Sequence, residues 1–413
     1  MKQLLIIVYK FPPMGGVGAR RWVKFSKYLV RSGYKVHILT VDYKFKDIVT
    51  WSSDVEKSIL IHKFKSKYPL WLLSESDSFF LKQIKRYSNF ILRKLFFFLD
   101  VSQFDARSIL RQAKKVIKEN SVKNVIASGP PFSINYIASY LKIDFSDINL
   151  IQDYRDNWND LNVYQYPKKE VMDSFTRKEE LAYKEFFTLS YADKVINVST
   201  DLTNTLQSKH SSLGGKFVTI TNGYDNDDYV DITSSNDSFN IIYAGSLFNE
   251  RIEAIYLILD AIISLNDNYI NKNLKIVVYS NFNSKSIDKK YRKLLGKNIF
   301  FEEFISPDRV IREISKASFC LSINSKFASY AFGTKIFDYM ALNKKIIHIS
   351  NGGTLSDILR GKGQFVCDYQ LENMRNSLID IKNNFINQDA KHVVEYNEFS
   401  LEKITIELEN LFI

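Results

Sequence analysis

Residues 330–341 combine the residue types that suit binding of a phosphate or diphosphate. Gly333 permits a tight turn, and Thr334 is a good cap for a helix that starts near Lys335. The free N–H groups and positive dipole end of such a helix attract anions beside the lysine. Asp338, one turn further on, could accept hydrogen bonds from ribose hydroxyls. An ordinary turn between a strand and a helix would show the same spacing, and on the spacing of this stretch alone it is the favoured interpretation.

A second group of charged residues follows a predicted strand at residues 149–152. Asp153, Arg155 and Asp156 lie at the carboxyl end of that strand, the edge at which open parallel sheets bind ligands. The three side chains could act on a substrate, or they could form an arginine–carboxylate pair that stiffens a loop. The residues alone favour neither interpretation.

Three glycines follow the first predicted strand, at residues 4–9, and precede a predicted helix at about 19–31. Gly15, Gly16 and Gly18 do not have the spacing of the dinucleotide fingerprint G-x-G-x-x-G, and the nearest acidic residue to the ribose position is Asp42. We therefore do not expect NAD binding. The loop is interpreted as a substrate-approach loop with close backbone access, and a tight turn that only joins strand to helix is the alternative.

The order of predicted elements indicates two doubly wound α/β domains. Strands are expected at residues 4–9, 35–41, 124–128, 149–152, 192–199 and 217–220 in the first half, and at 240–244, 274–279, 298–302, 319–323, 345–349 and 364–366 in the second. The polar residues 225–238 form the best candidate linker. We therefore expect domains over residues 1–230 and 231–395, followed by a C-terminal helix over 396–413 that packs back on the first domain.

The composition is that of a globular protein with two cores of ordinary size. The chain has 413 residues, of which 45% are hydrophobic, and it contains no apolar run long enough for a membrane span. Cys320 and Cys367 lack metal-ligand spacing and are expected to be buried thiols. The triplet from Asp225 to Asp227 fits a metal-binding D-x-D pattern, but a turn is the favoured interpretation. We expect a cytoplasmic protein that uses no metal and no cofactor.

Positive charge is concentrated in one region. The net charge is +11, and residues 81–125 contain eleven Lys and Arg against three acidic residues. A predicted helix over residues 79–99 carries aromatic and aliphatic side chains on one face with basic residues beside them. This pattern suits an anionic membrane surface, and it equally suits a helix packed on its own domain with a solvated basic side. No recognised nucleic-acid module is present, so nucleic acid is not an expected partner.

Six motifs follow one another in a fixed order along nearly the whole chain. They are Phe-Pro-Pro-x-Gly-Gly-Val-Gly-Ala-Arg-Arg-Trp, Gly-Pro-Pro-Phe-Ser, Asp-Tyr-Arg-Asp-Asn-Trp, Asn-Gly-Tyr-Asp, Tyr-Ala-Gly-Ser-Leu and Gly-Thr-Lys-Ile-Phe-Asp-Tyr-Met-Ala. In this set the chain resembles the retaining GT-B glycosyltransferases of family 4, in the subgroup that builds bacterial capsules and O-antigens. The resemblance implies an α/β GT-B fold with two Rossmann-like doubly wound domains that face each other across a cleft.

The resemblance also implies a donor site in residues 231–395, where the family binds a nucleotide-diphospho-sugar. In the family pattern E-x-F-G-x-x-x-x-E-x-x-A the second acid corresponds to Asp338, which would bind ribose. The first acid, which contacts the donor sugar, corresponds to Tyr330, and this departure puts the usual sugar contact in doubt. Gly333 and Thr334 would lie beside the diphosphate.

A basic pair, Arg followed by Lys, follows the first strand of the C-terminal domain in the family. Here these positions hold Ser246 and Arg251, just after Gly245, so only Arg251 carries over as a clamp on the diphosphate. An arginine suits bidentate contacts to phosphate. Lys335 could supply the second positive charge. Charge stabilisation by these groups would make a metal unnecessary.

Many family members place a histidine in the N-terminal half of the cleft, and no histidine of this chain matches it. Arg155 and Asp156 are the nearest substitutes, while Asp153 and the glycine loop would border the acceptor in residues 1–230. The implied function is sugar transfer from a nucleotide-sugar to a lipid-linked glycan at the cytoplasmic face of the inner membrane. Two alternatives remain, a nucleotide-sugar epimerase of related fold and a non-catalytic nucleotide- or glycan-binding subunit. Tyr330 and the missing histidine favour the second.

Overall fold

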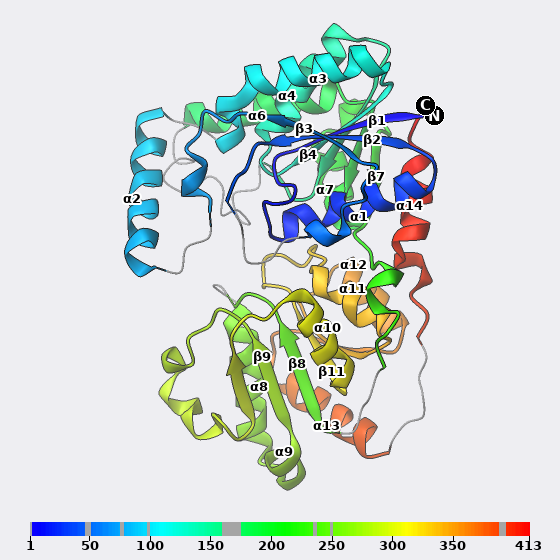
Figure 1. Cartoon of the computed structure of the whole chain (residues 1–413). Helices are drawn as coiled ribbons and strands as arrows, with labels where there is room; N and C mark the ends of the chain where they lie inside the picture. The colour runs from blue at the N-terminus through cyan, green and yellow to red at the C-terminus, as the bar shows by residue number, and fades with distance from the viewer. Residues whose placement is uncertain are drawn as a thin grey trace. The chain divides into compact units, whose positions relative to one another are not determined.

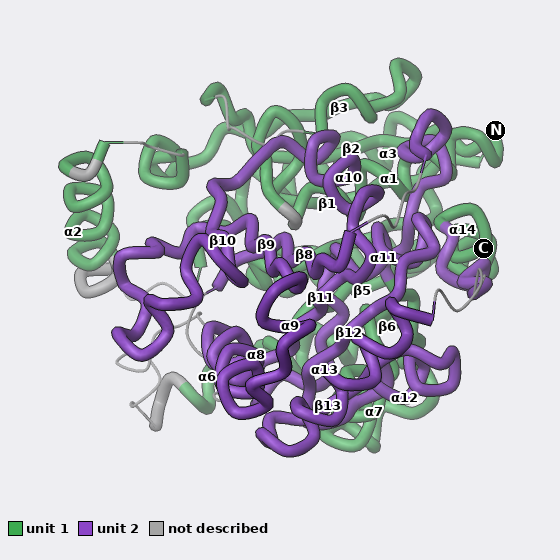
Figure 2. The backbone as a smooth tube through the Cα atoms, turned by 90° about the horizontal axis from the view of Figure 1, so that it is seen from below, with its two compact units in different colours: residues 1–221, 401–413 green, residues 222–400 purple. Residues whose placement is uncertain are grey.

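The computed structural model describes residues 2–45, 51–74, 78–96, 100–158, 175–233, 238–247, 251–387 and 394–413. The chain divides into two compact units, which Figure 2 colours separately. Unit 1 comprises Met1–Thr221 and Leu401–Ile413, and unit 2 comprises Asn222–Ser400. The division therefore falls before the expected linker at residues 225–238 and the expected boundary at residue 230, and the chain re-enters unit 1 at residue 401 rather than 396.

Unit 1 contains a parallel sheet of seven strands in the order β3-β2-β1-β4-β5-β6-β7. The strands are β1 (Gln3–Val8), β2 (Lys35–Val41), β3 (Leu60–Phe64), β4 (Asn124–Gly129), β5 (Asn149–Tyr154), β6 (Lys194–Asn197) and β7 (Phe217–Thr219). From β1 the chain adds strands on one side, and from β4 it adds them on the other. The strand order therefore reverses between β1 and β4, which is the point where such sheets bind ligands.

Helices cover both faces of this sheet (Figure 1). They are α1 (Val17–Arg31), α3 (Ala106–Asn120), α4 (Ser133–Asp144), α6 (Phe175–Ser190), α7 (Thr200–Lys209) and α14 (Leu401–Glu409), whereas α2 (Phe79–Phe96) lies at the side of the unit. Because alternate residues of a strand point to opposite faces, β1 feeds two cores. Leu5 and Ile7 pack with α3 and α4, whereas Leu4 and Ile6 pack with α1 and α14.

Unit 2 contains a parallel sheet of six strands in the order β10-β9-β8-β11-β12-β13. The strands are β8 (Asn240–Ala244), β9 (Lys275–Tyr279), β10 (Ile299–Glu302), β11 (Phe319–Ile323), β12 (Lys345–Ile349) and β13 (Phe365–Cys367). The helices are α8 (Arg251–Leu265), α9 (Asn268–Asn273), α10 (Pro307–Lys316), α11 (Thr334–Ala341), α12 (Thr354–Gly361) and α13 (Leu371–Ile386). Helices α8 and α13 pack on one face, and α10, α11 and α12 on the other. Here the order reverses between β8 and β11.

The expected alternation of strands and helices in two doubly wound sheets is confirmed. One strand was missed, because β3 lies at the sheet edge and its Leu60 and Ile61 are exposed, so it lacks the apolar run of its neighbours. The sequence also predicts a helix over residues 172–190, of which α6 covers Phe175–Ser190 and residues 172–174 lie outside the described part. In the part of the chain that the structure describes, no helix is both long enough and apolar enough to cross a membrane.

The C-terminal helix α14 belongs to the core of unit 1. Its Leu401, Ile404 and Leu408 are buried in the core that α1 shares with the sheet. Two asparagines at the amino ends of β4 and β5 bind the last residues of the chain. Asn124 Nδ2 donates to the carbonyl of Ile413 at 3.0 Å, and Asn149 Nδ2 donates to the carbonyl of Leu411 at 2.8 Å.

Helix α14 offers a matched pair of isoleucines for testing this packing. Ile404→Ala should destabilise unit 1 by about 2–5 kcal/mol, because it leaves a cavity in a buried core. Ile406→Ala is the control, since Ile406 is 56% exposed on the same helix and should change stability little. Native-state hydrogen exchange of α1 and the unit 1 strands measures the loss without assuming that both units unfold together. Equal effects of the two changes would contradict the packing.

Candidate functional site

The predicted site residues lie at the carboxyl edges of the two sheets, next to the reversal of strand order in each unit. In unit 1 the glycine loop follows β1, the Gly-Pro-Pro loop follows β4, and Arg155 follows β5. In unit 2 the loop that starts at Gly245 follows β8, and residues 324–333 follow β11. Since β1 neighbours β4 and β8 neighbours β11, topology brings the predicted loops together within each unit.

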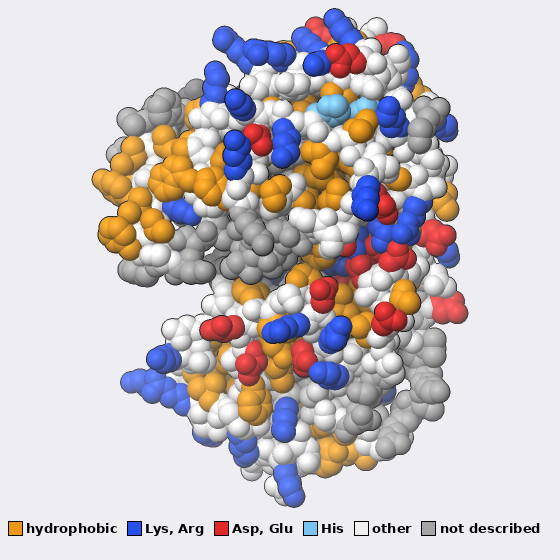
Figure 3. All heavy atoms as spheres, viewed as in Figure 1, with side chains coloured by type: hydrophobic (Ala, Val, Ile, Leu, Met, Phe, Trp, Pro, Cys, Tyr) orange, Lys and Arg blue, Asp and Glu red, His pale blue; other side chains and the backbone are white. Residues whose placement is uncertain are grey.

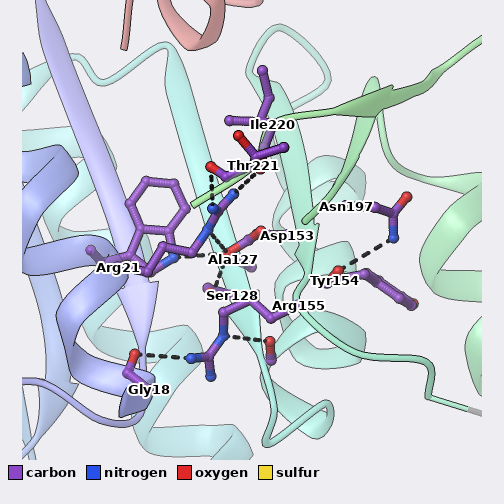
Figure 4. A network of polar contacts seen from close by, with 12 residues as sticks. Gly18, Arg21, Ala127, Ser128, Asp153, Tyr154, Arg155, Asn197, Ile220 and Thr221 are labelled. Carbon is purple, nitrogen blue, oxygen red and sulfur yellow. Dashed lines mark hydrogen bonds and ion pairs between the residues drawn. The ribbon is translucent and has the colours of Figure 1, made fainter. Parts of the chain in front are cut away.

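Asp153 is a buried structural residue at the end of β5. Three donors converge on its Oδ2 atom, namely Ser128 Oγ at 2.6 Å, Trp22 Nε1 at 2.9 Å and Arg21 Nε at 3.2 Å. Figure 4 labels Ser128 and Arg21 beside Asp153. The side chain is inaccessible to solvent. It therefore cannot contact an acceptor directly in this structure, contrary to the expectation from the loop, and it acts through the residues that it holds.

Arg21 is the buried cation of this ion pair, and no role for it was predicted. Its other nitrogens donate to the carbonyls of Ile220 at 2.9 Å and Thr221 at 3.0 Å, the last residues before the chain leaves unit 1. Burial lowers the pKa of the guanidinium, and Asp153 opposes this shift. The only sequence signal for this role was an arginine within the Gly-Ala-Arg-Arg-Trp motif.

Arg155 holds two loops together through their backbones. Its guanidinium donates to three carbonyls, those of Pro130 at 2.8 Å, Gly129 at 2.9 Å and Gly18 at 3.0 Å. A Cβ atom at Gly18 would lie 3.1 Å from Arg155 Nη1, so a glycine allows this close approach. The glycine loop is thus fastened to the Gly-Pro-Pro loop, and Arg155 positions both. The arginine–carboxylate pair considered from the sequence does exist, but Arg21 rather than Arg155 forms it.

Gly16 and Asp156 are more open to solvent than Asp153. Gly16 has φ 89° and precedes α1, a conformation that favours glycine. Asp156 is exposed, although crowding by protein atoms removes part of its hydration and raises the pKa of its carboxyl; Arg155 lowers that pKa and Asp153 raises it. Of the two acidic residues predicted here, Asp153 is buried and Asp156 is exposed.

In unit 2, Tyr243 supports the loop that carries the predicted clamp. Its hydroxyl donates to the carbonyl of Ser246 at 3.1 Å, and a Cβ atom at Gly245 would lie 2.9 Å from that hydroxyl oxygen. Burial raises the pKa of Tyr243, and a hydrogen bond with Arg251 acts against this rise. The half-buried Arg251 is the first residue of α8, so its guanidinium lies beside Tyr243 at the start of a helix.

A salt bridge joins the loop after β11 to the helix that Arg251 begins. Lys326 Nζ lies 2.7 Å from Glu253 Oε2, in the first turn of α8. Asn324 Nδ2 shapes the same loop by donating to the carbonyls of Ser329 at 3.1 Å and Ala331 at 2.9 Å. Tyr330, the departure from the family pattern, is half-buried in this loop. The structure therefore brings Arg251 and the loop that contains Tyr330 to the carboxyl edge of the unit 2 sheet.

Two local expectations about α11 were wrong. Gly333 rather than Thr334 is the cap, and Thr334 is the first helical residue. Gly333 has φ −62°, which any residue can adopt, and a Cβ atom there would meet nothing within 4 Å. Backbone freedom is thus not the reason for this glycine. A side chain would instead extend into open space in front of the helix start.

Asp338 is buried, and both of its carboxylate oxygens accept hydrogen bonds. Tyr229 Oη donates to Oδ1 at 2.6 Å, and Lys335 Nζ lies 2.9 Å from Oδ2. The positive charge of Lys335 is thereby directed at Asp338 rather than at the start of the helix. Tyr229 was not predicted as a site residue. It ends the short turn Asn226–Tyr229, where Asp225 Oδ1 accepts from the N–H of Asp227, so the turn interpretation of the D-x-D triplet is confirmed.

Among the described residues, no group of three or more His, Cys, Asp or Glu side chains is placed to hold a metal ion. Cys320 and Cys367 are buried free thiols in strands β11 and β13, as expected from their apolar surroundings.

Comparison with known proteins finds solved structures of similar architecture. No family model and no curated protein matches the chain. Among solved structures it is similar to a glycosyltransferase from Rickettsia africae ESF-5 (TM-score 0.62, 18% identity, 99% of this chain and 97% of that one). It is also similar to WaaG, a glycosyltransferase involved in lipopolysaccharide biosynthesis (0.56, 12%, 99% and 99%). A third is a TarM variant from S. aureus in complex with fondaparinux, α-GlcNAc-glycerol and UDP (0.61, 11%, 100% and 100%).

The chain has the α/β GT-B fold. Each unit is one Rossmann-like domain of that fold, and the similarity spans nearly the whole chain. Solved structures with this fold also include a candidate UDP-N-acetylglucosamine 2-epimerase from Listeria monocytogenes. At such low identities the similarity shows the fold, and the reaction has to be inferred from the site.

The role of Arg155 can be tested without knowledge of the substrate. Arg155→Lys keeps the charge, but a single ammonium cannot reach all three carbonyls, so unit 1 should lose about 1–3 kcal/mol of stability. Hydrogen exchange should quicken selectively at residues 10–18 and 129–133. Arg111→Lys, an exposed change on α3, is the control. Unchanged exchange in both loops would show that Arg155 does not hold them.

Proposed function

We propose that this protein is a glycosyltransferase that moves a sugar from a nucleotide-sugar to a lipid-linked glycan in bacterial surface-polysaccharide synthesis. The observation that carries this proposal is the edge of unit 2, where Arg251 and the Tyr330 loop lie together at the reversal of strand order. The GT-B fold, the ordered motifs of the family, the involvement of WaaG in lipopolysaccharide biosynthesis and the UDP complex of the TarM variant support it. No part of the proposal needs a metal or a cofactor.

The donor would bind through Arg251 and the start of α11. The guanidinium is suited to two parallel contacts with a diphosphate, and the exposed Gly333 leaves room for that group in front of the helix. Gly245 and Ser246 would approach it through their backbone. As the bond to the sugar breaks, negative charge grows on the leaving diphosphate, and these groups are placed to stabilise it.

Asp338 and Lys335 would exchange partners when the donor binds. In the free protein Tyr229 and Lys335 occupy the Asp338 oxygens. A ribose hydroxyl that replaces Lys335 at Oδ2 would satisfy the buried carboxylate and release the ammonium for the diphosphate. Tyr330 would then lie where relatives present a carboxylate to the donor sugar, which implies a difference in the choice of sugar.

The acceptor would bind to unit 1 at the glycine loop. Gly15, Gly16 and Gly18 allow close backbone approach, and Asp156 presents an exposed carboxylate at the same edge. Arg155 is best described as a positioning residue, because its donors are occupied by backbone carbonyls. In a retaining transfer, the leaving phosphate would take the acceptor proton on the face where the new bond forms.

The proposed acceptor places the protein at a membrane surface. A lipid-linked glycan is confined to the bilayer, so the enzyme would act as a peripheral protein on the cytoplasmic face of the inner membrane. That face is anionic, and the net charge of +11 favours attraction to it.

Two other functions share the same site. A nucleotide-sugar epimerase would release free epimerised sugar without any acceptor, whereas a transferase would need one. A non-catalytic binding subunit would bind donor without turnover. Incubation with a panel of UDP-, GDP-, CMP- and dTDP-sugars, with product analysis by mass spectrometry, separates the three cases. Epimerised sugar released in the absence of acceptor would overturn the transferase proposal.

The same panel should identify the donor by thermal shift. A matched nucleotide-sugar at about 100 times its Kd should raise the Tm of unit 2 by about 5 °C or more. Arg251→Ala should weaken donor binding about 10- to 100-fold, because a charge-assisted phosphate contact is lost. Arg292→Ala is the control, since Arg292 is an exposed arginine that precedes β10 at the opposite, amino edge of the sheet. Unchanged binding by Arg251→Ala would remove the clamp from the proposal.

A further inference from the structure

Helix α2 turns its apolar face away from the protein. Phe80, Tyr87 and Phe90 are 72%, 67% and 51% exposed, and Leu81, Ile84 and Ile91 are also exposed. In helical projection these six residues share one side of α2. In Figure 3 hydrophobic side chains cover the part of unit 1 that Figure 1 labels α2. An amphipathic helix of a globular domain normally buries this face.

The polar side of α2 holds the helix to unit 1. Lys85 Nζ donates to the carbonyl of Ser74 at 2.5 Å and to Ser74 Oγ at 2.9 Å, and Asn89 accepts from the hydroxyl of Tyr68. Leu92 is the side chain of α2 that packs with the small cluster around Tyr68. The structure thus contradicts the alternative in which the apolar face of α2 packs on its own domain. The contacts to unit 1 come instead from Lys85 and Asn89, while the basic residues Lys82 and Arg86 remain exposed.

Positive charge accompanies this apolar face. Lys82 and Arg86 are exposed on α2. On α3, the next helix along the chain, exposed basic residues at helical spacing form a stripe, namely Arg107, Arg111, Lys115 and Lys118. In the described part of the chain, Lys115 lies 3.9 Å from Glu119, and no ion pair is formed by Arg107 or Arg111. Helix α2 therefore presents exposed apolar and basic side chains, and α3 presents exposed basic side chains in the same unit.

This combination selects one kind of partner. A second copy of the chain would bring the same positive charge against α2, and like charges oppose such an interface. An anionic bilayer offers an apolar interior for the aromatic face and negative headgroups for the basic residues. Building on the proposed function, we propose that α2 inserts its apolar face into an anionic membrane while the α3 stripe contacts the headgroups.

A hydrogen-bond network fixes α2 relative to the glycine loop. Tyr68, which binds α2, follows Ser66 and Lys67 in the chain. Ser66 Oγ and the N–H of Lys67 both donate to Asp105 at 2.7 Å. Tyr9, which lies between β1 and the glycine loop, donates its hydroxyl to the same carboxylate at 3.2 Å. Docking of α2 would therefore set the height of the glycine loop above the bilayer.

The full-length protein should float with vesicles of equal parts phosphatidylglycerol and phosphatidylcholine and should not float with phosphatidylcholine alone. Changing three exposed α2 residues together, Phe80→Ser, Tyr87→Ser and Phe90→Ser, should weaken binding at least about tenfold at all salt concentrations, because apolar insertion is lost. The matched control changes exposed aromatics on α6, Tyr183→Ser and Phe186→Ser, and should bind as the unchanged protein does.

The α3 stripe should contribute in a way that salt removes. Arg107→Gln, Arg111→Gln and Lys118→Gln should each weaken binding about fivefold at low ionic strength, and this difference should shrink at high salt. Failure of the unchanged protein to bind anionic vesicles would overturn the proposal. So would equal weakening by the α6 control, or a dimer in sedimentation that the α2 changes dissociate.

Thermal shift with the donor separates this inference from the proposed function. The α2 variant should keep the full donor-induced rise in Tm, because the donor site lies in unit 2. If the unchanged protein does not bind anionic vesicles but shows the donor-induced rise in Tm, only the proposed membrane surface is overturned. Absence of a donor shift with vesicle binding retained would overturn the transferase proposal and leave the membrane surface standing.

Discussion

Four segments of unit 1 depend on one buried ion pair. Asp153 at the end of β5 receives Arg21 and Trp22 from α1 and Ser128 from β4, and Arg21 continues to the carbonyls of Ile220 and Thr221. Removal of either partner of such a buried pair leaves an uncompensated charge, which lowers the stability of the fold by about 3–5 kcal/mol. The pair thus specifies where α1 and its glycine loop lie relative to the central strands. It also fixes the point at which the chain leaves the unit.

Both units use charged side chains in a supporting role at the sheet edge where a ligand would bind. Arg155 fastens two loops through their carbonyls in unit 1, and the Glu253–Lys326 bridge joins the loop after β11 to helix α8 in unit 2. The groups left accessible beside these supports, Asp156 and Arg251, are then held on a stiff frame. A guanidinium whose N–H groups already donate to backbone carbonyls has few donors left for a substrate. An accessible side chain held beside it can bind the substrate instead.

Helix α2 shows the limit of periodicity as a guide to packing. Its stripe of Phe80, Ile84, Tyr87 and Ile91 identified an amphipathic helix from the sequence, and the helix is there. Periodicity gives the faces of a helix but not which face meets the domain. That depended on Lys85 and Asn89, which bind Ser74 and Tyr68 and so present the polar side inward. The edge strand β3 was missed for a related reason, since exposed residues leave no apolar run.

The sequence by itself determined the two doubly wound sheets, the carboxyl-edge position of the candidate residues and the buried state of both cysteines. These follow from apolar runs, turn residues and chain order, which are local or topological properties. Only the tertiary structure decided that Asp153 pairs with Arg21, that Asp338 is held by Tyr229 and Lys335, and that Gly333 caps α11 without a left-handed backbone. The physical reason is that a charged side chain takes whichever partner the fold brings within hydrogen-bond distance. Two of those partners lie far away in the sequence, since Arg21 is distant from Asp153 and Tyr229 is distant from Asp338.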